Sequence, residues 1–370
     1  MNIKNKIKII FLLPSLAGGG AEKVTLNYIK YLNKDIFEII LLIINKGGNY
    51  ENLLPNNITV IDFKIRRARY SIFKIIFYVT KYKPDILYST LQHTNLLILI
   101  FKFVFINNPK ILIREPNTPS LYLKQLPFIK RKLFLFMHKK LYSISDKIIV
   151  QCEEMKNDLI NTYKVNHKKV ITIYNPIDIK AIIADSTKFN PYYNNFINIV
   201  SVGRLTYQKG FDILIQAFKI VNLEYPKSRL TILGEGENKD NLINLAKQLN
   251  INENILFVGF QQNPYPYIKY SDVFVLSSRW EGFPNVLIEA LTCNARIVST
   301  NCKSGPKEII NNDNYGILIN VDDIIGLSDA IIKQINNKGD INVQQRAFDF
   351  DVNIIINKFE ELLLSLVPLN

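Results

Sequence analysis

Short apolar runs alternate with longer stretches of helical periodicity along most of this chain. Strand-like runs in the first half occur at residues 7–13, 38–44, 59–62, 85–89, 110–114, 147–150 and 170–173. A second series follows at residues 197–202, 229–233, 255–258, 272–276, 296–300 and 316–319. Apolar strands that alternate with helices are typical of parallel sheets covered on both faces. The pattern therefore predicts an α/β fold with two sheets.

The interval between the two series predicts a domain boundary. Residues 175–176 are Asn-Pro, and residues 180–195 are rich in Asn, Asp, Ser and Tyr, which is typical of a linker. We expect one Rossmann-like domain over residues 1–185 and a second over residues 186–370, each of ordinary size.

Two loops that follow apolar strands carry the strongest chemical pattern. In the first, residues 203–210 (GRLTYQKG), Arg204 offers a planar fork and Lys209 a mobile point charge for a diphosphate. In the second, residues 280–289 (WEGFPNVLIE), Glu281 lies in the loop and Glu289 lies on a helix predicted to begin at Pro284. Carboxylates bind hydroxyls, and the amides of residues 285–287 at the helix start favour an anion. Each charge alone is as readily structural, but their combination predicts a nucleotide-sugar site.

These motifs resemble those of the retaining glycosyltransferases of family 4. The resemblance rests on Glu281 and Glu289 with seven residues between them, on the 203–210 loop, and on Gly19-Gly20-Ala21-Glu22 after an apolar strand. Residues 174–178 (YNPID) and 304–309 (SGPKEI) match as well. The resemblance implies a GT-B fold, in which two facing Rossmann-like domains enclose a deep interdomain cleft. The chain is similar in particular to bacterial N-acetylhexosaminyltransferases that act on undecaprenyl-diphosphate-linked glycans or surface polysaccharides.

The resemblance implies a hexosyltransferase whose N-terminal domain binds the acceptor and whose C-terminal domain binds a UDP-sugar. It also implies that the final helix, expected at residues 351–367, packs back onto the N-terminal domain. Glu289 would bind the ribose hydroxyls and Glu281 the transferred sugar, while Arg204 and Lys209 would hold the diphosphate. The acceptor hydroxyl would attack from the face that the diphosphate leaves, so the anomeric configuration would be retained. The departing phosphate would take the proton.

Further donor contacts follow from the same resemblance, and they lie at Gly19, Gly20, Gly234, Phe260, Phe283, Asn285 and Val286. Glycine lets a backbone amide approach a phosphate closely. The order around Gly18 is not the Gly-x-Gly-x-x-Gly of dinucleotide-binding proteins, which disfavours an oxidoreductase.

Three residues near the expected acceptor side keep two interpretations each. His93 follows the apolar run 85–89, where related enzymes place a polar residue near the reacting sugar, but a partly buried histidine at a helix start fits equally well. Arg114 and Glu115 end the next strand, where they either contact the acceptor or brace the loop.

Positive charge is concentrated in the first half of the chain. Residues 1–185 carry 29 Lys and Arg against 13 Asp and Glu, whereas residues 186–370 carry 17 against 19. The densest segment, residues 124–140, interleaves basic residues with Leu, Phe and Met. No nucleic-acid motif accompanies it, so the segment indicates a helix at an anionic membrane surface and no nucleic-acid partner. A helix packed on its own sheet with a hydrated basic face is the alternative.

Other features narrow the class of protein. Three cysteines without Cys-x-x-Cys spacing and the lack of a signal peptide favour a cytoplasmic protein, peripheral on the inner face of the membrane. Residues 96–106 are too short to span a bilayer and are expected to form a buried helix. The acidic groups at residues 322–323 and 349–351 are expected to cap helices, so no metal or other cofactor is predicted. A GT-B nucleotide-sugar epimerase and a non-catalytic basic membrane-binding relative are the alternatives.

Overall fold

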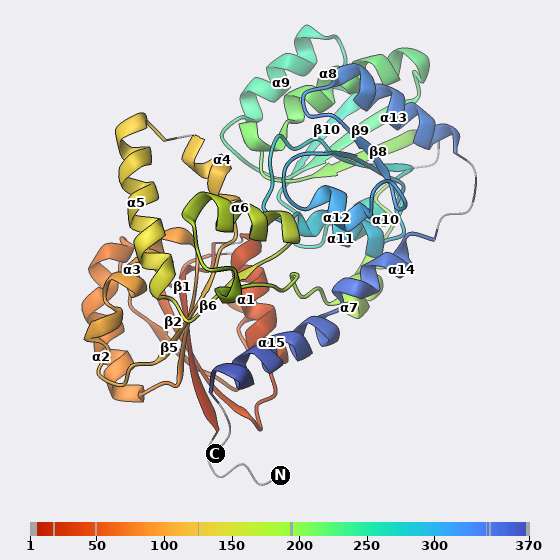
Figure 1. The fold of residues 1–370 in the computed structure, drawn as a ribbon. Helices are drawn as coiled ribbons and strands as arrows, with labels where there is room; N and C mark the ends of the chain where they lie inside the picture. Colours follow the sequence, from red (N-terminus) through yellow and green to blue (C-terminus); the bar gives the residue numbers. More distant parts are fainter. Residues whose placement is uncertain are drawn as a thin grey trace. The chain divides into compact units, whose positions relative to one another are not determined.

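The computed structural model describes residues 6–367 except 18, 49, 125, 193–194, 338 and 340–341 (Figure 1). The chain divides into two compact units, which are Met1–Pro176 with Val352–Asn370 (unit 1) and Ile177–Asp351 (unit 2). The stretch 180–195, expected to be a linker, begins with helix α7 (Ile179–Ser186), which Asp178 caps by accepting from the amide of Ala181 at 3.0 Å. Helix α7 packs against helices of unit 2, so the unit begins before the linker suggested by composition.

Unit 1 contains a seven-stranded sheet in the order β3-β2-β1-β4-β5-β6-β7, and every pairing in it is parallel. Strand β1, an interior strand of this sheet, is buried on both faces, since Ile9, Ile10 and Phe11 are all inaccessible to solvent. The strands are β1 (Ile7–Ser15), β2 (Phe37–Asn45), β3 (Thr59–Asp62), β4 (Ile86–Thr90), β5 (Lys110–Arg114), β6 (Lys147–Val150) and β7 (Val170–Thr172).

Helices cover both faces of this sheet, as right-handed crossovers between parallel strands require. On one face, α1 packs with the final helix α15, where the rings of Tyr28 and Phe359 stack with centroids 4.1 Å apart. Figure 1 shows α2, α3 and α5 on the other side of the sheet. The helices of unit 1 are α1 (Gly20–Tyr31), α2 (Ile72–Tyr82), α3 (Gln92–Ile100), α4 (Pro119–Lys124), α5 (Phe128–Ile144), α6 (Glu153–Tyr163) and α15 (Val352–Leu366).

Unit 2 contains a six-stranded parallel sheet in the order β10-β9-β8-β11-β12-β13. Its strands are β8 (Ile197–Val202), β9 (Ser228–Leu233), β10 (Ile255–Gly259), β11 (Val273–Leu276), β12 (Ile297–Thr300) and β13 (Ile317–Ile319). The core includes apolar side chains of α8 and α13, which pack against each other. Besides α7, its helices are α8 (Phe211–Glu224), α9 (Lys239–Gln248), α10 (Tyr265–Lys269), α11 (Asn285–Thr292), α12 (Pro306–Ile310), α13 (Ile324–Asn336) and α14 (Gln344–Ala347).

Strand order reverses once in each sheet, between β1 and β4 in unit 1 and between β8 and β11 in unit 2. Chain connections leave such a switch point in opposite directions, which opens a crevice at the carboxyl ends of the two strands. The loops at these ends are therefore the places where each unit can bind a ligand. The two predicted sheets and the α/β class are confirmed. Within the part of the chain that the structure describes, no helix is long and apolar enough to cross a membrane.

Candidate functional site

Lys209 and Glu281 meet at the switch point of unit 2. Lys209 Nζ lies 2.6 Å from Glu281 Oε1, and Ser278 Oγ donates to the same oxygen at 2.6 Å. The glutamate side chain is only 7% exposed and that of the lysine 16%. Because β8 and β11 are neighbours, the loops that follow them bring together two charges that are distant in the sequence. A partly buried, hydrogen-bonded ion pair fixes orientation more than it adds stability.

Hydrogen bonds between backbone and side chains join the two loops. Ser277 Oγ donates to the carbonyl of Lys209 at 2.9 Å, and Gln208 Nε2 donates to the carbonyl of Trp280 at 2.8 Å. A backbone bond from the amide of Arg279 to the carbonyl of Gln208, also 2.8 Å, completes the connection. The ion pair therefore lies on a loop pair that is held as one body.

Arg279 is the positioning residue that sequence reasoning missed. Its guanidinium binds both carboxylate oxygens of Asp212 (2.9 and 2.6 Å) and Oδ1 of Asp322 (2.8 Å). It also lies 4.0 Å from the ring centroid of Tyr207. The hydrogen bonds that Arg279 donates to Asp212 raise the pKa of Arg279 further above its usual value. The signal was present in the sequence, because Asp212 and Arg279 each lie within three residues of a member of the ion pair.

Gly234 and Gly210 allow close backbone approaches around the site. A Cβ on Gly234, whose φ is +138°, would collide with the carbonyl oxygen of Gly203, and its amide donates to Gly259 at 2.8 Å. Gly210, with φ +62°, lies so close to the carbonyl of Ser277 that a Cβ on this residue would collide with the carbonyl oxygen. The carboxyl ends of β8, β9 and β10 thus converge, and Phe260, just after β10, is 49% exposed beside them.

Helix α11 carries the remaining predicted donor contacts of unit 2. Pro284 is its N-cap, and Asn285 and Val286 are its first two residues. The amide of Leu287, expected to face phosphate, instead donates to the carbonyl of Pro284 at 3.0 Å. Glu289 lies on the same helix and is 7% exposed, and Phe283 is 8% exposed, with its ring 5.9 Å from that of Phe350.

Arg204 differs from Lys209 in its surroundings. It lies in the loop after β8, its side chain is exposed, and no carboxylate among the described residues forms an ion pair with it. Of the two cations predicted to hold a diphosphate, one is therefore paired with Glu281 and the other has its full charge available.

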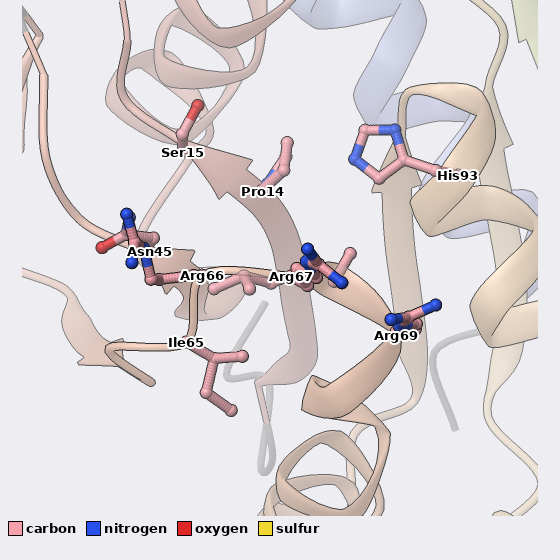
Figure 2. Close-up of a pocket in the computed structure, with 10 residues that line it drawn as sticks. Pro14, Ser15, Asn45, Ile65, Arg66, Arg67, Arg69 and His93 are labelled. Atoms are coloured by element: carbon pink, nitrogen blue, oxygen red, sulfur yellow. The ribbon is translucent and has the colours of Figure 1, made fainter.

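The other predicted site residues, Gly19, Gly20 and His93, belong to unit 1. Gly19 is the N-cap of α1, and Gly20 its first residue. A Cβ on Gly19 would collide with the carboxylate of Glu22, which accepts a hydrogen bond from Ser15 Oγ at 3.0 Å. Gly18 lies outside the described residues. His93, at the start of α3, lines a cavity of about 670 Å³ at the switch point of unit 1 (Figure 2), and partial burial lowers its pKa.

Arg114 and Glu115, at the end of β5, are both buried and brace their loop. Arg114 Nη2 donates to Asn175 Oδ1 at 2.6 Å, and Tyr142 OH donates to Glu115 Oε2 at 2.5 Å. Glu115 is inaccessible to solvent, and burial raises its pKa from 4.5 to about 7. Neither side chain is available to an acceptor.

The acidic groups considered for metal binding have other partners. Asp322 binds Arg279, Asp323 caps α13 by accepting from the amide of Gly326 at 2.8 Å, and Asp349 pairs with Arg346 at 2.5 Å. Within the described ranges, no three His, Cys, Asp or Glu side chains are grouped to hold a metal ion.

The parallel sheets and their loops define a protein of the GT-B glycosyltransferase class. Residues 184–347 match the family described as Glycosyl transferases group 1, and residues 18–181 match Glycosyltransferase Family 4. The chain belongs to these glycosyltransferases and is a hexosyltransferase, so the predicted family, fold and enzyme class are confirmed.

Individual relatives cover almost the whole chain. It is 32% identical to an uncharacterized glycosyltransferase of Methanocaldococcus jannaschii, over 91% of this chain and 90% of that protein. It is 31% identical to N-acetylgalactosamine-N,N'-diacetylbacillosaminyl-diphospho-undecaprenol 4-alpha-N-acetylgalactosaminyltransferase of Campylobacter jejuni, over 85% of this chain and 86% of that one. Among solved structures, HepE of Anabaena in complex with UDP-glucose superposes with a TM-score of 0.83 at 21% identity, covering 97% of this chain and 100% of that one.

Proposed function

We propose that this glycosyltransferase transfers an N-acetylhexosamine, with retention of anomeric configuration, from a UDP-sugar to a lipid-linked or surface-polysaccharide acceptor in cell-envelope glycan synthesis. The observation that carries the proposal is the buried contact of Lys209 with Glu281 at the β8/β11 switch point. A solved relative in fold binds UDP-glucose, and the Campylobacter relative is named for an N-acetylgalactosaminyl transfer to a diphospho-undecaprenol glycan.

The donor is held by charges with different partners. Lys209 has three N–H donors, so it can keep Glu281 and still donate to a phosphate oxygen. Glu281 offsets part of the positive charge of Lys209. The exposed Arg204 supplies the uncompensated positive charge for the diphosphate. Glu281 itself, which Ser278 holds by a hydrogen bond to one oxygen, contacts hydroxyls of the transferred sugar. These two cations supply the positive charge that the departing UDP requires, in place of a metal ion.

Nucleoside and sugar contacts complete the proposed donor site. Glu289 accepts hydrogen bonds from the ribose hydroxyls, and the base lies near Gly234 and Phe260. Backbone at Phe283, Asn285 and Val286 orients the sugar and the β-phosphate. Gly19 and Gly20 contribute backbone amides to the diphosphate, and His93 contacts the reacting sugar.

In the reaction, the acceptor oxygen forms a bond to the anomeric carbon as the bond from that carbon to the UDP oxygen breaks. Attack occurs on the face from which UDP departs, and the acceptor proton passes to the departing phosphate. No side chain has to act as a base in this reaction. This is consistent with the ion pair that Glu281 forms with Lys209.

Product analysis tests the proposal. The protein is incubated with a diphospho-undecaprenol-linked N-acetylgalactosaminyl acceptor and, in turn, UDP-GlcNAc, UDP-GalNAc, UDP-glucose, UDP-galactose and GDP-mannose. We expect UDP release and an acceptor heavier by one N-acetylhexosamine, with the α configuration by NMR. A β-linked product would disprove retention, and transfer from GDP-mannose alone would disprove the UDP donor. Activity that survives EDTA is expected, because the proposed site uses no metal.

Helix α5 supports a peripheral position at an anionic membrane. Four of its large apolar side chains are exposed by 60–80% (Phe128, Ile129, Leu133 and Phe136), and Lys130, Arg131 and Lys132 are exposed among them. An ordinary packed helix would bury these apolar side chains. The segment at residues 96–106, expected to be buried, also exposes Phe103 by 82% and Ile106 by 80%. Apolar and basic side chains together are typical of interfacial helices.

Flotation with phosphatidylglycerol vesicles tests this position. Neutralising Lys130, Arg131 and Lys132 to Gln should release the protein from the vesicles, since each basic residue contributes about 1 kcal/mol at an anionic surface. Lys168→Gln, an exposed lysine in the turn that precedes β7, serves as the control. Flotation unchanged in the triple variant would mean that α5 does not contact the membrane.

A further inference from the structure

Unit 1 contains a basic cavity of about 670 Å³, and His93 is the one residue of its lining that also belongs to the proposed donor site. Figure 2 shows segment 65–69 passing beside the end of β1, with His93 at the upper right of the view. The cavity is lined by Pro14, Ser15, Ile44, Asn45, Ile65, Arg66, Arg67, Ala68, Arg69 and His93.

The sheet topology explains why these residues converge. Ser15 ends β1, Asn45 ends β2, Ile65 follows β3 and His93 follows β4. These strands are neighbours in the order β3-β2-β1-β4 and are all parallel, so their carboxyl ends share one edge. The cavity includes the β1/β4 switch point, which is where a sheet of this kind binds ligands.

The cavity has an excess of positive charge. It is lined by Arg66, Arg67 and Arg69 and by no carboxylate, and none of the three arginines forms an ion pair with another described residue. Two carboxylates that are near the cavity in the chain, Glu22 and Asp62, have other donors. Glu22 accepts from Ser15 Oγ at 3.0 Å, and Asp62 accepts from the amide of Lys64 at 2.9 Å. Guanidinium groups that lack a carboxylate partner are suited to bind the oxygens of a phosphate or diphosphate.

An apolar stripe starts at the rim of the cavity. Arg69 Nη2 donates to Tyr70 OH at 2.9 Å, and Tyr70 is followed by Phe73 and Phe77 on α2. These rings are exposed by 59%, 81% and 59%. A spacing of four residues places Phe73 and Phe77 along one face of α2, and Tyr70 lies in the turn that precedes this helix. The ligand that matches both features has an anionic group attached to a hydrocarbon chain.

We propose that this cavity binds the diphosphate of a polyprenyl-linked acceptor through Arg66, Arg67 and Arg69, with the first prenyl units lying along Tyr70, Phe73 and Phe77. The inference rests on the proposed function, because it assigns the binding site for the acceptor's lipid end. It accounts for two features that transfer chemistry does not require, the unpaired arginines and the exposed aromatic rings beside them.

Calorimetric titration of the full chain with geranyl diphosphate tests the inference. Saturating UDP is present throughout, so that the donor site cannot take up the probe. We expect Arg66→Gln/Arg67→Gln to weaken binding of geranyl diphosphate and of inorganic pyrophosphate by about tenfold or more. Phe73→Ser/Phe77→Ser should weaken only geranyl diphosphate, and geraniol should not bind measurably. Lys168→Gln, at the opposite edge of the sheet, should leave both affinities unchanged.

Further measurements distinguish loss of binding from loss of folding, and a diphosphate ligand from a lipid headgroup. Arg66→Lys/Arg67→Lys keeps the charges but not the planar forks, and its affinity should lie between those of the wild type and the Gln variant. Equal affinity of the wild type and the Gln variant for geranyl diphosphate would overturn the inference. So would loss of flotation on phosphatidylglycerol vesicles with unchanged geranyl diphosphate affinity, because the arginines would then bind a lipid headgroup.

The outcomes for the two proposals differ. If no UDP-sugar is transferred but geranyl diphosphate binding still depends on the arginines, the proposed function fails and the cavity assignment stands as a diphosphate site. If transfer proceeds with the same KM for a diphospho-linked acceptor in wild type and Gln variant, the cavity assignment fails and the function stands.

Discussion

The two sheets arrange charge differently at the same topological position. At the β8/β11 switch point of unit 2, Lys209 is bound to Glu281, with Ser278 on the same oxygen. At the β1/β4 switch point of unit 1, the three arginines of the cavity have no carboxylate partner among the described residues. Both positions are crevices made by parallel strands that diverge.

This difference in charge pairing indicates how each site is suited to interact with a ligand. A paired lysine is already oriented, and it can direct the glutamate to neutral hydroxyls while sharing its charge with phosphate. Unpaired arginines gain most of their favourable interaction only when an anion arrives. The first arrangement is suited to positioning a reacting sugar, and the second to holding a charged group that does not react.

Breaking the pair from the acidic side should have the largest effect. Glu281→Gln removes the sugar contact and should lower kcat by about 100-fold, a loss comparable to that of a key transition-state contact. The same change frees the charge of Lys209, so UDP should bind more tightly. Steady-state kinetics and UDP titration measure the two effects separately.

The opposite change provides the control for that experiment. Lys209→Gln should weaken UDP binding, because it removes a phosphate donor and leaves Glu281 without its cation. If both substitutions weaken UDP to the same extent, the lysine is a structural partner of the glutamate and not a phosphate ligand.

A second comparison concerns two buried glutamates, Glu281 with a lysine and Glu115 with a tyrosine. Burial raises the pKa of Glu115 from 4.5 to about 7. A raised pKa stabilises the fold below the unfolded value and loses this effect as pH rises through the folded value. Between about pH 4.5 and about pH 8, the wild type should therefore lose about 3 kcal/mol of unfolding free energy relative to Glu115→Gln. Urea denaturation across this range measures the loss, and parallel curves for the two proteins would contradict it.

Arg204 tests whether the uncompensated cation of unit 2 holds the donor. Arg204→Gln should raise KM for the UDP-sugar by about tenfold or more, since a hydrogen bond to a charged group is worth about 2 kcal/mol. Stability should not change, because the side chain is exposed and unpaired among the described residues. Arg204→Lys should recover only part of the affinity, and full recovery would show that a point charge is sufficient.

Disrupting the contacts of Arg279 should have the smallest effect on activity, because this residue acts by positioning the two loops. Asp212→Asn removes the two-point partner but leaves Asp322, so kcat should fall by about fivefold, in keeping with a modest displacement of catalytic groups. UDP affinity should stay within about twofold, since neither residue contacts the proposed phosphate position. A change in UDP affinity larger than that in kcat would make Arg279 a donor ligand.

Much of the fold was accessible from apolar patterning, because a strand covered on both faces has a near-continuous apolar sequence. The runs around Ile9 and Val275 are strands β1 and β11 of the structure, as predicted. The candidate donor loops could be proposed from the sequence because Arg204, Lys209 and Glu281 follow such strands closely. Composition was a poorer guide in two places: the polar stretch 180–195 includes most of the short, largely apolar helix α7, and the apolar side chain of Phe103 is exposed.

Which residues follow strands and which charges are available can be predicted from the amino-acid sequence, because strand periodicity and residue chemistry are local properties. Which of these charges meet depends on the three-dimensional fold. The order of strands brings Lys209 to Glu281 in unit 2, while in unit 1 it gathers Arg66, Arg67 and Arg69 around the end of β1, where no described carboxylate forms an ion pair with them. Charges interact through space, so the partner that a side chain finds depends on which strands are neighbours and not on distance along the chain.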